Sequence, residues 1–207
     1  MIDGLMKSTI DPLWEAMATP LVKARLTPNQ VTFIGLVLII LVSLAYLWHQ
    51  SAALYGLTLA LAFVFDALDG AVARRRNMST KAGGYFDAMV DRYQELVVLA
   101  TLAHLHDVWP LALACFSGSV ITSYAKARTA IEMPISNTDW PDVFERMERI
   151  IYLCVLMLAA GLLGTGLIAW GLALFAVLTH ATALQRARRA TQMLRAQDAA
   201  DEEITDP

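Results

Sequence analysis

The sequence predicts an all-α integral membrane protein with six transmembrane helices and an N-terminal amphipathic helix at the membrane surface. Of its 207 residues, 57% are hydrophobic, and the mean hydropathy is +0.51, well above that of a typical soluble protein. Residues 26–65 and 150–185 contain no Asp, Glu, Lys or Arg, and residues 96–125 contain only Asp107. Each of these intervals can hold the roughly 20 apolar residues that cross a bilayer.

The amphipathic helix is expected first in the chain, over residues 10–23. Apolar residues such as Trp14 and Met17 alternate there with charged ones such as Glu15, which suits a helix lying along the membrane interface. Pro12 and Pro20 leave an irregular segment as the alternative. We expect the six spanning helices at residues 31–48, 52–73, 85–105, 109–129, 149–163 and 165–186. The short turns after the first and fifth of them predict antiparallel neighbours.

The basic residues predict the orientation of these helices. Apart from Arg92 in the third helix, the sixteen Lys and Arg residues lie in or beside the N-terminal segment, the loops after the second and fourth helices, and the C-terminal tail. The positive-inside rule then places both termini and the 74–81 loop in the cytoplasm. Because the basic residues alternate with spans, they do not indicate a nucleic-acid-binding surface.

The same distribution divides the chain into three parts. We expect a cytoplasmic or interfacial segment over residues 1–27, a six-helix membrane domain that carries the chemistry over residues 28–190, and an acidic cytoplasmic tail over residues 191–207. The charge and composition of that tail predict disorder.

Four aspartates in strongly apolar sequence are the main candidates for chemistry. They are Asp66, Asp69, Asp87 and Asp91. Their spacing places one pair on one face of the second helix and the other pair on one face of the third, and the short loop between these helices predicts that they are adjacent. Clustered carboxylates at a membrane boundary repel each other unless cations lie among them. Oxygen ligands without nearby His or Cys favour Mg²⁺ or Mn²⁺.

The residues around the aspartates indicate what these cations would hold. Gly70 and Gly83 remove side chains where a ligand would approach a helix, and Arg74 can donate two hydrogen bonds to a phosphate. Together these features predict a diphosphate site. The alternative, that the aspartates only neutralise the arginines of the loop, does not explain small residues at fixed offsets.

The complete run, D-x-x-D-G-x-x-A-R, eight residues, then G-x-x-x-D-x-x-x-D, matches the signature of the CDP-alcohol phosphotransferase family, and the chain resembles these membrane enzymes of phospholipid synthesis. The resemblance implies two metal ions, Mg²⁺ or Mn²⁺. Asp66 and Asp87 would bridge the two ions, and Asp69 and Asp91 would each be a further ligand of one ion. It also implies that Asp91 is the general base for the acceptor alcohol. The alcohol then attacks the β-phosphorus of a CDP-linked donor, such as CDP-diacylglycerol, and CMP leaves.

The resemblance also implies a donor site. Its residues would be Gly70, Ala73, Arg74, Thr80 and Gly83 around the CDP moiety, and Asn29, Gln30, Val31 and Thr32 near the cytidine. The second group lies in a T-P-N-x-V-T segment that is similar to one found in many relatives. Its alternative role is an ordinary helix start, with Thr27 as the cap and Pro28 in the first turn.

A second basic cluster indicates the acceptor. It consists of Lys126, Arg128, Arg146 and Arg149. Positive charge beside the aspartates favours an acceptor that itself bears a phosphate. The cluster is similar to elements of phosphatidylinositol phosphate and archaetidylinositol phosphate synthases, which implies inositol phosphate as the acceptor, with glycerol 3-phosphate second. The alternative is that these cations set the topology and bind lipid headgroups.

Other classes of function stay open at this point. One is an aminoalcohol phosphotransferase that uses CDP-choline or CDP-ethanolamine, against which the basic cluster argues. Another is a membrane transporter or scaffold that has kept a metal site. A homodimer is expected by resemblance alone.

Overall fold

Every regular element in the described residues, 7–135 and 144–205, is a helix in the computed structural model. In chain order the helices are α2 (Lys7–Lys23), α3 (Pro28–His49), α4 (Ala52–Asp66), α5 (Leu68–Arg75), α6 (Lys81–His106), α7 (Trp109–Glu132), α8 (Arg146–Leu163) and α9 (Leu167–Thr205). The all-α prediction is therefore confirmed.

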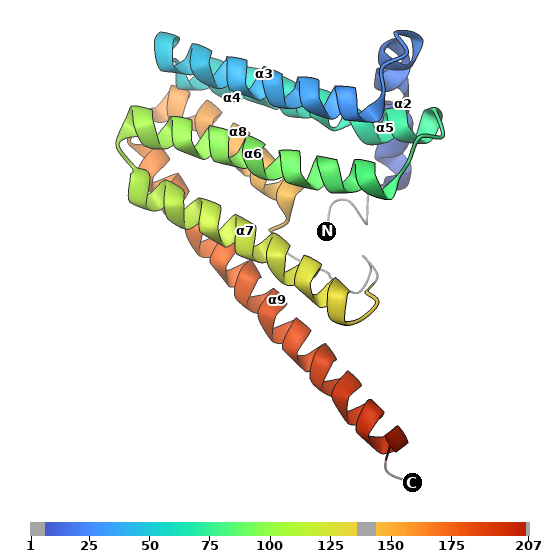
Figure 1. Ribbon diagram of the computed structural model, residues 1–207. Helices are drawn as coiled ribbons and strands as arrows, with labels where there is room; N and C mark the ends of the chain where they lie inside the picture. Colours follow the sequence, from blue (N-terminus) through green and yellow to red (C-terminus); the bar gives the residue numbers. More distant parts are fainter. Residues whose placement is uncertain (1–6, 136–143, 206–207) are drawn as a thin grey trace.

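The long helices pack side by side in a bundle (Figure 1). Helix α3 packs against α4, α5 and α6, while α7 packs against α6 and α9, and α8 against α4 and α9. The main core lies between these helices and contains fully buried Ile39, Tyr55, Leu99 and Met157. By length and composition, three helical stretches of the described chain can cross a membrane, namely Pro28–His49, Ala52–Arg75 and Leu167–Asp201. These support an integral membrane protein, and the number six stays a prediction.

The second predicted helix is interrupted. Helix α4 ends at Asp66 and α5 begins at Leu68, so the helix predicted over residues 52–73 is broken at Ala67, although the two parts together remain one stretch long enough to cross a membrane. Ala67 has helical dihedral angles, and its N–H still bonds to the carbonyl of Phe63. The interruption places Asp66 at the end of one helix and Asp69 in the first turn of the next.

The C-terminal segment is helical rather than disordered. Helix α9 continues to Thr205 and extends well beyond the bundle (Figure 1). Its extension is rich in Ala, Arg, Gln, Met and Leu, which are strong helix formers, and these residues outweigh the acidic end that predicted disorder. The tail predicted over residues 191–207 is therefore helical as far as Thr205, and its separation from the membrane domain stays a prediction.

Helix α2 lies across the end of the bundle beside α5 (Figure 1). Despite its two prolines it is one helix, and its Ala18 is buried in a second core cluster with Leu68 and Val72. Arg75 donates to the carbonyl of Glu15 over 2.7 Å and to the Thr19 hydroxyl over 2.6 Å. Arg75, which the sequence analysis treated only as one of the basic residues that set the orientation, thus links α2 to α5, the helix that carries Asp69.

Candidate active site

The structure brings the four predicted aspartates together at one end of the bundle. Asp66 is 2% exposed and Asp91 is 8% exposed. Asp87 lies one turn before Asp91 on α6 and interacts electrostatically with Asp66 and Asp69. Side chains join the two aspartate-bearing helices, because Gln94 of α6 reaches Asp66 over 2.8 Å, and α3 packs against both α4 and α6.

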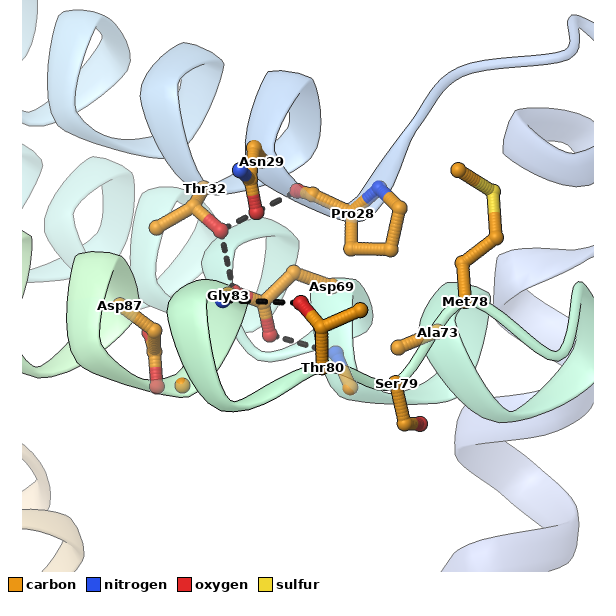
Figure 2. Close-up of a pocket in the computed structure, with 12 residues that line it drawn as sticks. Pro28, Asn29, Thr32, Asp69, Ala73, Met78, Ser79, Thr80, Gly83 and Asp87 are labelled. Atoms are coloured by element: carbon orange, nitrogen blue, oxygen red, sulfur yellow. Dashed lines mark hydrogen bonds between the residues drawn. The ribbon is translucent and has the colours of Figure 1, made fainter.

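Hydrogen bonds fix two of these carboxylates. The Thr32 hydroxyl donates to Oδ2 of Asp69 over 2.5 Å, and the backbone N–H of Gly70 points at its Oδ1 (Figure 2). The buried amide of Gln94 donates to Oδ1 of Asp66. Helix α3, which supplies Thr32, therefore positions an aspartate that lies 37 residues further along the chain.

The guanidinium of Arg146 lies among the carboxylates. Its Nη2 is 2.9 Å from Oδ2 of Asp66, 2.6 Å from Oδ1 of Asp91 and 2.6 Å from Oε1 of Gln94. In this arrangement, the described part of the chain contains no three His, Cys, Asp or Glu residues gathered as metal ligands. The Arg146 guanidinium instead lies between the carboxylates of Asp66 and Asp91.

The donor set nevertheless fits a hard divalent cation. Four carboxylates from α4, α5 and α6 supply the oxygen ligands that Mg²⁺ and Mn²⁺ prefer. Oδ1 of Asp91 is buried and, although ion-paired, accepts no well-oriented hydrogen bond from the described residues. A buried carboxylate oxygen without such a bond is unusual in a folded protein and is suited to a metal ion.

A cleft opens beside Asp69 and Asp87 (Figure 2). It is lined by Pro28, Asn29, Thr32, Asp69, Gly70, Ala73, Met78, Ser79, Thr80, Gly83, Gly84 and Asp87. Six of the residues predicted to bind the donor are among them: Asn29, Thr32, Gly70, Ala73, Thr80 and Gly83. We refer to this as the donor cleft.

Three predicted donor residues lie elsewhere. Val31 is fully buried in the second core cluster, because it lies on the face of α3 that packs against α5. Gln30 caps α3, since its side chain accepts from the N–H of Thr27 over 2.9 Å and its own N–H donates to the Thr27 hydroxyl. The exposed Arg74 is outside the lining of the cleft, although it lies one turn from Gly70. In the 27–32 segment, Thr27 and Gln30 form the helix cap while Asn29 and Thr32 line the cleft, and contact with the cytidine stays a prediction.

Three helices begin at the donor cleft. They are α3 near Asn29, α5 near Gly70, and α6 near Gly83, where the Thr80 hydroxyl caps the helix by accepting from the N–H of Gly83. The first turn of a helix has backbone N–H groups without intrahelical partners and a partial positive charge. The cleft is thus suited to a phosphate-bearing ligand.

Two glycines near the site lack a side chain for different physical reasons. A Cβ atom at Gly35 would lie 2.5 Å from Oδ1 of Asp66 and 3.1 Å from its Cα, so this glycine allows α3 to approach α4. A Cβ atom at Gly70 would meet only Nη1 of Arg74, at an ordinary 3.5 Å. Protein packing therefore leaves Gly70 open toward the cleft.

A second cavity, of about 580 Å³, lies on the other side of Asp87. Its lining is Asp87, Ala88, Asp91, Ser123, Lys126, Ala127, Glu145, Arg146, Met147, Glu148, Arg149 and Arg186. The volume lies in the range of small-molecule sites, which is roughly 300 to 1,000 Å³. Because the donor cleft and this cavity share Asp87, ligands in the two would meet at the carboxylates. We refer to the second cavity as the basic pocket.

The predicted basic cluster is only partly assembled there. Lys126, Arg146 and Arg149 line the pocket, but the Arg149 side chain is 2% exposed and its Nε and Nη2 each lie 2.8 Å from Oε1 of Glu95. Arg128 lies outside the pocket and pairs with Glu132, one turn along α7 on an exposed face.

Sequence reasoning missed two residues of the site. Arg186 of α9 lines the basic pocket and donates to the carbonyl of Thr122 over 2.7 Å and to Glu145 over 3.1 Å. The sequence feature that could have indicated Arg186 is its position directly after the uncharged residues 150–185. Gln94 follows Asp91 by three residues, so helical spacing places it on the aspartate face.

Comparisons with known proteins agree with this geometry. The sequence pattern of the CDP-alcohol phosphatidyltransferase family matches residues 25–184. An archaetidylinositol phosphate synthase from Pyrococcus horikoshii is 31% identical over 195 residues, which cover 94% of this chain and 98% of that protein. The crystal structure of Mycobacterium tuberculosis phosphatidylinositol phosphate synthase with CDP-DAG bound is similar at 25% identity and a TM-score of 0.75, covering 86% of this chain and 94% of that one.

The same mycobacterial synthase in complex with manganese and citrate has a TM-score of 0.74 at 25% identity, covering 86% of this chain and 88% of that one. The relatives are thus enzymes, and they resemble this chain over the helices that carry both the aspartates and the basic pocket. With its complete aspartate run and a family match over most of its length, the chain belongs to the CDP-alcohol phosphatidyltransferase family of membrane transferases.

Proposed function

We propose that this enzyme transfers a phosphatidyl group from CDP-diacylglycerol, or a related CDP-lipid, to a hydroxyl of inositol phosphate and releases CMP. The observation that carries the proposal is a basic pocket joined to the carboxylates through Asp87. Lys126, Arg146 and Arg186 give that pocket the donors that a phosphate on the acceptor requires. The relatives named as inositol phosphate lipid synthases support the same acceptor.

Asp66, Asp69, Asp87 and Asp91 would hold two divalent cations, Mg²⁺ or Mn²⁺, at the proposed site. When bound, such ions neutralise the diphosphate of the donor and stabilise the departing CMP. The manganese complex of the mycobacterial synthase supports a divalent metal in this family.

The remaining roles belong to side chains of the chain itself. Asp91 lines the basic pocket, where it can accept the proton of the acceptor hydroxyl as that oxygen attacks the β-phosphorus. Gly70, Ala73 and Gly83 let the donor approach the helix backbones, and Asn29 and Thr32 border the nucleotide. Arg74, whose Nη1 lies near Gly70, would contact the donor phosphates from outside the lining of the cleft.

For the protein in its membrane, we propose six spanning segments that correspond to α3, α4 with α5, α6, α7, α8 and the first half of α9. Helix α2 then lies along the cytoplasmic interface, and residues 28–190 form the catalytic domain. Both termini and the site face the cytoplasm, as the basic residues indicate. The exposed apolar side chains of the bundle face lipid or the second subunit of a homodimer.

Release of CMP from CDP-diacylglycerol by the purified enzyme tests the proposal. We expect release in the presence of a divalent cation and inositol phosphate, and little with inositol, which lacks the phosphate. Glycerol 3-phosphate is the informative competitor, because it carries the same recognition group. Faster CMP release with glycerol 3-phosphate would identify that compound as the acceptor instead of inositol phosphate. Activity only with CDP-choline and diacylglycerol would refute the proposed phosphatidyl transfer.

Removing positive charge from the basic pocket is expected to weaken acceptor binding. For Lys126→Ala and Arg186→Ala we expect the acceptor KM to rise by about tenfold or more, because each loses a charge-assisted hydrogen bond to phosphate. The donor KM should change little, since neither residue lines the donor cleft. Arg188→Ala, an exposed position on α9, is the matched control. A rise confined to the donor KM would contradict the assignment.

A further inference from the structure

We infer that Arg146 is an exchangeable counter-ion: it holds the carboxylates together before metal binds, and metal binding displaces it toward the acceptor phosphate. The inference rests on the proposed function, because it assumes that the aspartates bind metal and that the basic pocket binds the acceptor. It adds an energetic coupling between these two events.

The contacts of Arg146 place it in direct competition with a metal ion. Its Nη2 lies within 2.9 Å of Oδ2 of Asp66 and within 2.6 Å of Oδ1 of Asp91, which are oxygens of two proposed metal ligands. Mg²⁺ binds such oxygens at roughly 2.0–2.1 Å. A dication at that distance and a guanidinium in its present position would compete for the same lone pairs and repel each other. Metal binding therefore requires the guanidinium to leave.

The basic pocket gives the displaced guanidinium a destination. Arg146 begins α8 and lines the pocket together with Lys126 and Arg186, and its side chain is 27% exposed, so it can turn without unpacking a core. Its Nε is buried and has no hydrogen-bond partner among the described residues. The side chain thus has an unused donor in its present position, which a phosphate in the pocket could accept from.

Helix α8 contributes two arginines to the basic pocket, Arg146 and Arg149. A comparison of their contacts shows why the exchange is assigned to Arg146. Arg149 is almost fully buried, and its partner Glu95 is not among the proposed metal ligands. Metal binding leaves that pair intact. Of these two arginines, Arg146 is the one that contacts the proposed metal ligands Asp66 and Asp91, so it is the one that can link the two sites.

Metal affinity measured without substrates tests the competition directly. We would titrate the full-length protein with Mn²⁺ and follow free Mn²⁺ by electron paramagnetic resonance. Arg146→Gln should bind Mn²⁺ about tenfold more tightly than the wild type, or more, because a competing charged hydrogen bond has been removed. Lys126→Gln removes a charge from the same pocket without touching the carboxylates, and Arg188→Gln removes an exposed one, so both should stay near the wild-type affinity.

Equal Mn²⁺ affinity in the wild type and Arg146→Gln would overturn the inference, and so would an equal gain in Lys126→Gln, which would indicate only general electrostatics. Failure of every variant and of the wild type to bind Mn²⁺ would overturn the proposed metal site as well. The two failures are therefore distinguishable.

The coupling has a second readout. Because linkage is reciprocal, inositol phosphate should tighten Mn²⁺ binding to the wild type, and this effect should shrink in Arg146→Gln but persist in Arg188→Gln. In the wild type, mass spectrometry after phenylglyoxal treatment should find faster modification of Arg146 with Mg²⁺ than with a chelator. This arm needs no variant to fold, and equal or slower modification with Mg²⁺ would refute the displacement.

Discussion

Replacing Asp91 by Asn is expected to reduce turnover by about 10²- to 10⁴-fold, the range over which a positioned general base contributes to catalysis. The amide keeps the size of the side chain but cannot take the proton of the acceptor hydroxyl. It is also a weaker metal ligand than a carboxylate, which adds to the loss. Donor binding should largely survive, because Asp91 lines the basic pocket and not the donor cleft.

The same helix offers a matched control for this change. Asp107 ends α6 at the opposite end, where it is exposed and has a φ of 53°. Asn tolerates that left-handed conformation, so Asp107→Asn makes the same chemical change far from the carboxylates. The measurement is CMP release at saturating donor and acceptor, together with CDP-diacylglycerol binding. Wild-type turnover in Asp91→Asn would remove Asp91 from the role of base.

The aspartate cluster could be predicted because it depends on local spacing. Asp87 and Asp91 are one turn apart on one helix, and helical periodicity alone places them on the same face. The loop between Arg75 and Lys81 is short, which brings α5 and α6 to the same end of the bundle. Gly70 and Thr80 border the cleft for the same reason, since each lies within a turn of a helix start.

The interruption at Ala67 could not be predicted, because no proline lies near this residue and the first glycine after it is Gly70. The apolar run of residues 52–65 favours a helix and gives no sign of where that helix ends. The change of helix coincides with a change of packing partners, because α4 packs against α3 and α8 whereas α5 packs against α3 and α2.

The basic pocket shows a different limit of sequence reasoning. Lys126 and Arg128 are two residues apart, so they point to different sides of α7, and the charge pattern does not say which side faces the site. The contact of Arg146 with Asp66 joins residues 80 positions apart and depends on how α8 packs against α4. Arg186 enters the pocket from α9 by an equally remote contact. The clustering of charges in the sequence therefore indicated where the basic pocket lies, but tertiary packing determines which residues line it.

Substitution of Gly70 should most clearly distinguish an effect on substrate binding from an effect on protein stability. We expect Gly70→Ala to lower the kcat/KM for the CDP-lipid by about 10²-fold, the effect of a displacement of roughly 1 Å in a reacting ligand, and Gly70→Val to lower it further. Stability should not fall, because the added Cβ meets only Arg74 at 3.5 Å and Ala favours a helix over Gly by about 1 kcal/mol.

Gly35→Ala is the opposite case and serves as the comparison. Its added Cβ would lie 2.9 Å from the Cβ of Asp66 and 3.1 Å from the Cα, so α3 and α4 must separate. Such overpacking costs about 1–3 kcal/mol and displaces a proposed metal ligand. We therefore expect Gly35→Ala to lower the thermal unfolding midpoint and Mn²⁺ affinity together, whereas Gly70→Ala leaves both near wild type and loses donor binding. Wild-type donor kinetics in Gly70→Ala would mean that the cleft beside Asp69 does not hold the CDP moiety.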